Sequence, residues 1–161
     1  MKQKGFTLIE LMVVLTILAI ALAFGLPSMG YIIDSNRLTS STNELVGALN
    51  FARSEAVKRG RTIRIAASSG GTGWQGGYRV WIDTDNDGSY DAGEEQLRIF
   101  DAFKDETTAT GPAAAISFSG SGFASGATSI KLCSGNKNIA TGRKVDVSSA
   151  GRVTIIDEVC S

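Results

Sequence analysis

The chain has 161 residues, 43% hydrophobic and 20% charged, which is the composition of a folded globular protein. Its 16 basic and 16 acidic side chains balance, so general attraction to polyanions is not expected. The sequence contains no histidine, which removes imidazole as a general base or metal ligand, and it carries no phosphate-binding loop, nucleophile elbow or dinucleotide fingerprint. These observations argue against an enzyme.

Residues 6–26 form an apolar run in which the only polar side chains are Thr7, Glu10 and Thr16. As a helix this run would measure about 31 Å at about 1.5 Å per residue, enough to cross the hydrocarbon core of a bilayer. We therefore expect a transmembrane helix over residues 6–26. An ionised glutamate near the centre of such a helix costs roughly 2.5 to 3.5 kcal/mol, and less near its end, so Glu10 should face a cationic partner.

The residues before this run differ from an ordinary secretory signal. Lys2 and Lys4 precede Gly5, and no small-residue cleavage site follows the apolar segment. The leader Met-Lys-Gln-Lys-Gly joined to Phe-Thr-Leu-Ile-Glu resembles the signal of type IV prepilins and type II secretion pseudopilins. The resemblance implies that a prepilin peptidase removes residues 1–5 by cleavage after Gly5, methylates the amine of Phe6 and leaves the span in place.

In those families the carboxylate at the position of Glu10 is thought to meet the amine of Phe6 on a neighbouring subunit. Two buried opposite charges offset each other's desolvation, whereas a misplaced subunit leaves one charge unpaired at a cost of roughly 3 to 5 kcal/mol. Glu10 is thus expected to set the register of subunits in a filament. The alternative is a plain signal anchor in which Glu10 is incidental.

The helical pattern continues beyond the apolar run. Gly25 and Pro27 interrupt it, and because the periodicity resumes at once they predict a kink rather than a stop. An amphipathic helix is expected over residues 27–60, and Gly60 is the expected C-terminal stop. Its apolar face holds Leu38, Leu45, Leu49, Ala52 and Ala56. The basic side chains around its end are expected to face solvent, other subunits or lipid headgroups; they are Arg53, Lys58, Arg59, Arg61 and Arg64.

Residues 61–161 predict a β-rich domain, with glycine clusters at 70–77 and 120–126 marking flexible turns. The expected strands are 62–67, 78–83, 96–100, 115–119, 128–133, 143–147 and 152–156. The positive-inside rule places the lysines of the leader in the cytoplasm, so this domain would face the oxidising periplasm. A Cys133–Cys160 disulfide is expected there, worth about 3 to 4 kcal/mol; the alternative is two free buried thiols.

Residues 52–60, 78–97 and 149–153 resemble the GspH/FimT group of minor pilins and pseudopilins. The resemblance implies an α+β fold in which one long N-terminal helix packs on an antiparallel sheet. It also implies a subunit that initiates or caps a type IV pilus together with other pilin subunits, anchored in the inner membrane with its C-terminal domain in the periplasm. The alternative is the minor pseudopilin H of type II protein secretion. The cysteine pair and a Gly-Arg stretch favour the pilus.

An acidic segment follows the second expected strand. Asp83, Asp85, Asp87, Ser89, Asp91 and Glu94 fit the spacing of a helix-flanked calcium loop, with Gly88 at its sharp turn. Calcium prefers such a set of six to eight oxygen ligands, so Ca²⁺ is a candidate cofactor. Strands rather than helices are expected on either side, and the alternative is a solvated acidic hairpin turn.

A thin basic cluster lies near the C-terminus, where FimT-like pilins are similar in using an arginine-bearing loop to bind DNA. Arg143, Lys144 and Arg152 supply cationic donors suited to phosphate contact. The Gly-Arg-x-Arg pattern of that group is met here only as Gly-Arg-Lys-Val, Asp146 lies nearby, and no aromatic residue is interleaved to stack on bases. DNA is therefore a candidate partner, which would make the subunit a pilin that captures DNA for uptake in competence; a solvated strand end is the alternative.

Overall fold

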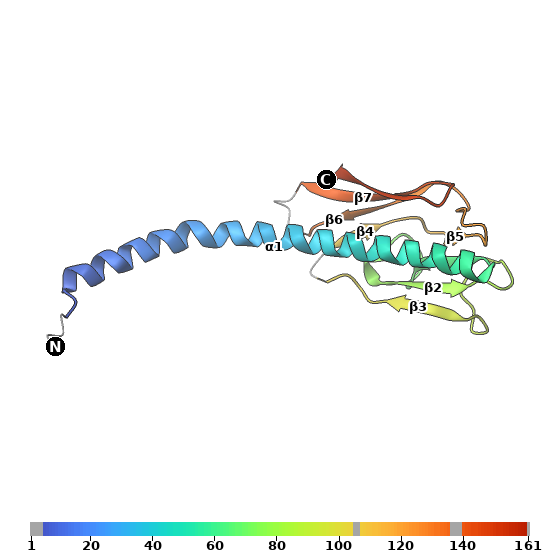
Figure 1. The fold of residues 1–161 in the computed structure, drawn as a ribbon, viewed down its shortest axis with the longest axis horizontal. Helices are drawn as coiled ribbons and strands as arrows, with labels where there is room; N and C mark the ends of the chain where they lie inside the picture. The colour runs from blue at the N-terminus through green and yellow to red at the C-terminus, as the bar shows by residue number, and fades with distance from the viewer. Residues whose placement is uncertain (1–4, 105–106, 136–139, 161) are drawn as a thin grey trace.

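The computed structural model describes residues 5–104, 107–135 and 140–160, with the side chains of residues 23–29 left undescribed. In these residues a single long helix precedes a β-rich region (Figure 1). The helices are α1 (Leu8–Arg59) and the short 3-10 helix η1 (Trp74–Gly76). The strands are β1 (Ile63–Ala67), β2 (Tyr78–Ile82), β3 (Gln96–Phe100), β4 (Thr108–Thr110), β5 (Ile116–Phe118), β6 (Thr128–Cys133), β7 (Thr141–Val147) and β8 (Val153–Val159).

Helix α1 has a defined cap at each end. Thr7 and Glu10 form a reciprocal capping box at its start, and Gly60 ends it in the left-handed conformation, φ 62°, where glycine is favoured. The helix continues through Gly25 and Pro27, so the expectation that it does not stop there is confirmed, and the expected kink stays a prediction. Its N-terminal half projects away from the strands, and its C-terminal half lies against them (Figure 1).

The strands form two antiparallel sheets of four strands each, where the sequence predicted one sheet. The first has the order β3-β2-β1-β5, and the second has the order β4-β6-β7-β8. Both sheets pack against the C-terminal half of α1 (Figure 1). The α+β class with a long N-terminal helix on antiparallel strands is confirmed.

One hydrophobic core joins α1 to both sheets. Leu45, Leu49, Ala52 and Ala56 of the helix are fully buried, as the periodicity of the sequence predicted. The strand side chains that complete the core include Ile63, Ile65, Val80, Phe118, Ile130, Leu132, Val145 and Val147.

Two segments differ from the sequence-based expectation. Strand β4 was not predicted; its three residues pair with β6. The glycine-rich stretch 70–77 was expected to be a flexible turn, but it contains η1, and Trp74 within it is fully buried. The indole N–H of Trp74 donates a hydrogen bond to the carbonyl oxygen of Pro112 at 3.0 Å, so this turn is anchored to the β4–β5 connection.

Among the described residues, no helix combines the length and hydropathy required of a membrane span. The expected span 6–26 includes residues 23–26, whose side chains lie outside the described set.

Candidate functional site

The N-terminal end of α1 holds the Glu10 carboxylate in a local network. The backbone N–H of Thr7 and its hydroxyl donate to Glu10 Oε2 at 2.8 and 2.9 Å, and the backbone N–H of Glu10 donates to Thr7 Oγ1 at 3.3 Å. The Thr-x-x-Glu spacing is the signature of a capping box, which the sequence analysis did not use. In the single chain, Glu10 is therefore bonded to its own helix end and has no cationic partner among the described residues.

The first turns of α1 expose an apolar surface on every side. Phe6 is 89% exposed, and the large apolar side chains from Leu8 to Leu22 are each exposed by at least 50%. A shallow hollow of about 370 Å³ lies among Phe6, Ile9, Glu10, Val13 and Val14. A continuous apolar surface of this kind marks a site that contacts another protein or a membrane instead of water. Glu10 is the carboxylate within it.

The expected disulfide is present and lies across the second sheet. It joins Cys133 at the end of β6 to Cys160 just after β8, and both strands flank β7. A Cβ atom added to Gly142 of β7 would overlap Cys160 Sγ and lie 3.1 Å from Cys133 Sγ. Gly142, which the sequence analysis placed in a DNA-binding pattern, thus has a structural reason to be glycine.

The structure does not gather the three candidate DNA-binding residues. Arg143 and Lys144 are adjacent on β7 and so point to opposite faces of the sheet. Arg143 forms an ion pair with Asp157, and Lys144 pairs with Asp146 at 3.2 Å. Arg152 lies in the turn before β8, near the opposite end of β7 from Arg143.

One basic residue near this group was missed. Lys131 of β6 lies directly opposite Lys144 in the antiparallel register, so the two side chains share one face. Such a like-charged cross-strand pair is unfavourable unless it is compensated. Here Lys131 Nζ lies 3.8 Å from Glu158 Oε1 and donates to the carbonyl oxygen of Val159 at 2.7 Å. The position of Lys131 opposite Lys144 follows from the pairing of β6 with β7, which the sequence pattern does not show.

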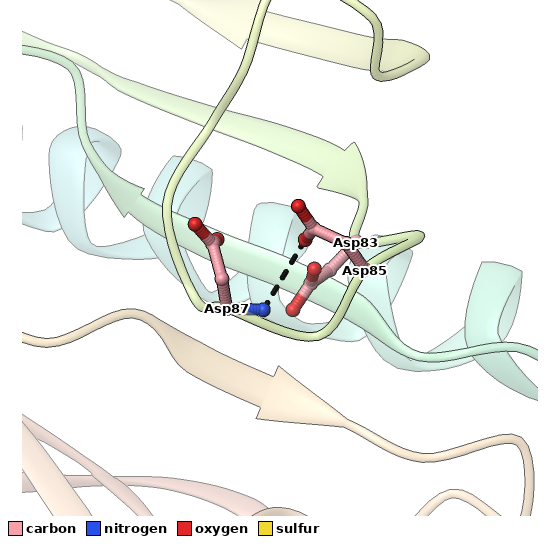
Figure 2. Close-up of side chains that lie close together, drawn as sticks. All are labelled: Asp83, Asp85 and Asp87. Carbon is pink, nitrogen blue, oxygen red and sulfur yellow. Dashed lines mark hydrogen bonds between the residues drawn. The ribbon is translucent and has the colours of Figure 1, made fainter.

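The acidic segment forms a turn between β2 and β3. Carboxylate oxygens of Asp83, Asp85 and Asp87 lie within 4.8 Å of one another, and the backbone N–H of Asp87 donates to Asp85 at 3.2 Å (Figure 2). The other two predicted carboxylate ligands, Asp91 and Glu94, do not belong to that group among the described residues.

Glu94 is committed to the backbone of the same turn. It accepts hydrogen bonds from the N–H groups of Thr84 at 2.8 Å and Asp91 at 3.2 Å. The structure therefore brings together three of the five predicted carboxylate ligands.

Two arginines expected to face outward instead make internal contacts. Arg53 of α1 donates to the carbonyl oxygens of Gly122 and Ala150. Arg64 of β1 pairs with the buried carboxylate of Asp83. Both contacts join residues far apart in the sequence, so helical periodicity gave no sign of them.

A long helix with an exposed apolar N-terminal half, packed at its other half on antiparallel strands, is the pilin fold. The model of the prokaryotic N-terminal methylation motif matches residues 1–26, and the model of the type II transport protein GspH matches residues 41–151. The chain belongs to the GspH family.

The individual relatives found are a pilin-like protein and a fimbrial protein. The chain is 33% identical over 97 residues to the pilin-like protein PilA1 of Thermus thermophilus, which covers 59% of this chain and 58% of that protein. It is 34% identical over 99 residues to a fimbrial protein of Pseudomonas aeruginosa, which covers 62% of this chain and 60% of that one. The matches thus span less than two thirds of these curated relatives.

The structural match is more extensive. The fold is similar to the crystal structure of the type IV minor pilin FimU of Pseudomonas aeruginosa, with a TM-score of 0.65 and 28% identity over 78% of this chain and 92% of that one.

Proposed function

We propose that this chain is a minor pilin, a structural and non-catalytic subunit that helps to initiate or cap a type IV pilus. The observation that carries the proposal is the fold: the likeness to the minor pilin FimU extends over 92% of that structure. The exposed apolar start of α1 supports it, because that surface needs a lipid or protein environment.

The N-terminal segment supplies the proposed route into the filament. A prepilin peptidase cleaves after Gly5 and methylates Phe6, and residues 6–26 hold the subunit in the inner membrane with its C-terminal domain in the periplasm. The match to the N-terminal methylation motif supports this processing. On assembly, Glu10 pairs with the Phe6 amine of a neighbouring pilin subunit, and the desolvation cost of each charge is offset by the other.

Helix capping is compatible with that role. The hydrogen bonds from Thr7 occupy Glu10 Oε2, and no hydrogen bond to Oε1 is found among the described residues. Oε1 is therefore the oxygen to which we assign the incoming amine. The local network holds the carboxylate at the helix start, where the positive end of the helix dipole also favours a negative charge.

The second candidate is a minor pseudopilin of type II secretion, and the description of the matching family as a type II transport protein favours it. The separating experiment deletes the gene in a host that has both systems and measures sheared surface pili and secreted type II substrates in parallel. We expect loss of pili with secretion intact, restored by the full chain. Loss of secretion with normal piliation would favour the pseudopilin instead.

A further inference from the structure

We propose that the guanidinium of Arg64 occupies the cation position of the acidic turn, so that Asp83 to Glu94 is closed by an internal arginine and takes no calcium. The turn matches a calcium-loop sequence, yet its first acidic position already has a positive partner. Arg64 Nε donates to Asp83 Oδ2, and the Asp83 side chain is 0% exposed.

The same guanidinium reaches the next part of the turn. Arg64 Nη2 donates to Asn86 Oδ1 at 3.0 Å, and Asn86 itself adopts a left-handed conformation with φ 65°. Asp83 also accepts the backbone N–H of Asn86 at 2.8 Å through its other oxygen. Both oxygens of Asp83 are thus engaged, and the buried charge is compensated as a buried ion pair requires.

Gly88 provides an independent sign that the turn is shaped around the arginine. A Cβ atom at Gly88 would lie 3.0 Å from Arg64 Nη1, and its φ of 89° is one that other residues rarely adopt. In a calcium loop this glycine serves the sharp turn alone. Here it also leaves room for the guanidinium.

The ligand count points the same way. Calcium takes about six to eight oxygens at roughly 2.3 to 2.6 Å, whereas three carboxylates converge here and one of them is bonded to Arg64. Glu94, which would close a calcium loop with both oxygens, accepts backbone N–H groups with each of them. The planar guanidinium of Arg64 donates to the Asp83 carboxylate and to the Asn86 amide oxygen at the same time. A calcium ion could bind these two oxygens only if Arg64 moved away.

The test uses the purified full chain in detergent, with calcium chloride alone as the probe. We expect no binding heat on titration to millimolar calcium and no change in Tm between calcium and EDTA. Arg64→Gln leaves the Asp83 charge unpaired, so this variant should have a lower Tm that calcium partly restores. Arg64→Gln/Asp83→Asn is the matched control and should show no calcium response.

Binding heat or a calcium-dependent Tm in the unaltered chain would overturn the proposal. So would a folded Arg64→Gln variant whose Tm is the same in calcium and in EDTA. If Arg64→Gln does not fold, terbium luminescence of the unaltered chain decides: absence of sensitised emission from the nearby Trp81 supports the arginine, and emission contradicts it. Arg64→Lys keeps the charge and should remain insensitive to calcium.

Discussion

Arg53 Nε donates a hydrogen bond to the carbonyl oxygen of Gly122 at 3.0 Å, which ties α1 to the loop between β5 and β6. Its Nη2 donates to the carbonyl oxygen of Ala150 in the β7–β8 turn at 3.2 Å. The two loops also touch each other, since a Cβ atom at Gly151 would overlap the Gly122 oxygen. One helix side chain therefore fixes the connection between the sheets and the turn that carries Arg152.

Arg53→Met should lower the free energy of unfolding by about 1 to 3 kcal/mol, because the partly buried Gly122 carbonyl and the exposed Ala150 carbonyl both lose a charged donor. A guanidinium chloride titration followed by the fluorescence of the buried Trp74 and Trp81 measures the change. Arg61→Met is the matched control: this exposed arginine lies just past α1 and should change stability by less than about 0.5 kcal/mol. Equal effects would show that Arg53 acts only through charge.

Tyr78→Phe should leave the free energy of unfolding at neutral pH unchanged or raise it by up to about 1 kcal/mol. The Tyr78 side chain is fully buried against Phe100, and its hydroxyl has no hydrogen-bond partner among the described residues. Removing an unsatisfied buried hydroxyl while keeping the ring relieves a desolvation cost. A loss above about 1 kcal/mol in the same titration would mean that the hydroxyl has a partner.

The same residue should govern stability at alkaline pH. Burial, with a smaller contribution from the Glu44 carboxylate, raises the pKa of Tyr78 above its ordinary value of 10.0. The unfolded chain then loses this proton near pH 10 while the folded chain keeps it, so stability is full below about pH 10 and falls as the pH rises further. Tyr78→Phe should flatten that fall in a series of Tm measurements. Tyr31→Phe, an exposed control on α1, should not.

Gly142→Ala should destabilise the second sheet by roughly 1 to 3 kcal/mol, the usual cost of overpacking. The added methyl group would overlap Cys160 Sγ and lie 2.5 Å from the Leu132 carbonyl oxygen. Counting free thiols by alkylation and mass spectrometry checks whether the disulfide still forms. Gly126→Ala, where a Cβ meets nothing within 4 Å, is the control and should remain fully oxidised.

Glu10→Gln and Thr7→Val separate charge pairing from helix capping. Glutamine still completes a capping box but has no charge, so Glu10→Gln should reduce incorporation into sheared pili by at least about tenfold. Valine removes the Thr7 hydroxyl yet keeps the Glu10 charge, so Thr7→Val should retain most incorporation. Immunoblots of the pilus and membrane fractions give the comparison, once N-terminal mass spectrometry shows both variants cleaved after Gly5. The reverse order would assign Glu10 to capping.

Local signals in the sequence predicted the parts of the fold that depend on near neighbours. The helix face from Leu45 to Ala56 and the stop at Gly60 follow from a period of about 3.6 residues and from glycine's freedom at positive φ. Most strands were placed to within a few residues. Strand β4 was missed because Thr108–Thr110 is too short to show alternation, and it is defined only by its partner β6.

Long-range partners were beyond the reach of the sequence pattern. The hydrogen bonds of Arg53 and Arg64 join residues 19 to 97 positions apart in the sequence. The close packing at Gly142 depends on the disulfide that crosses its strand. The division of the strands into two sheets could not be predicted for the same reason. An alternating pattern indicates a strand but does not show which strand pairs with it. The Glu10 capping box was local and predictable, since Thr7 lies three residues before it.

The single core that α1 shares with both sheets has a mechanical consequence. Strand β1 starts four residues after α1 ends and pairs antiparallel with β2, which lies along the C-terminal half of the helix (Figure 1). The buried side chains of α1 run from Leu38 to Ala56, so their contacts form a seam that follows the helix axis. A pull on the projecting end of α1 would load this seam in shear, with all of its contacts resisting together instead of opening one after another. The domain would then bear tension best in the direction in which the helix points.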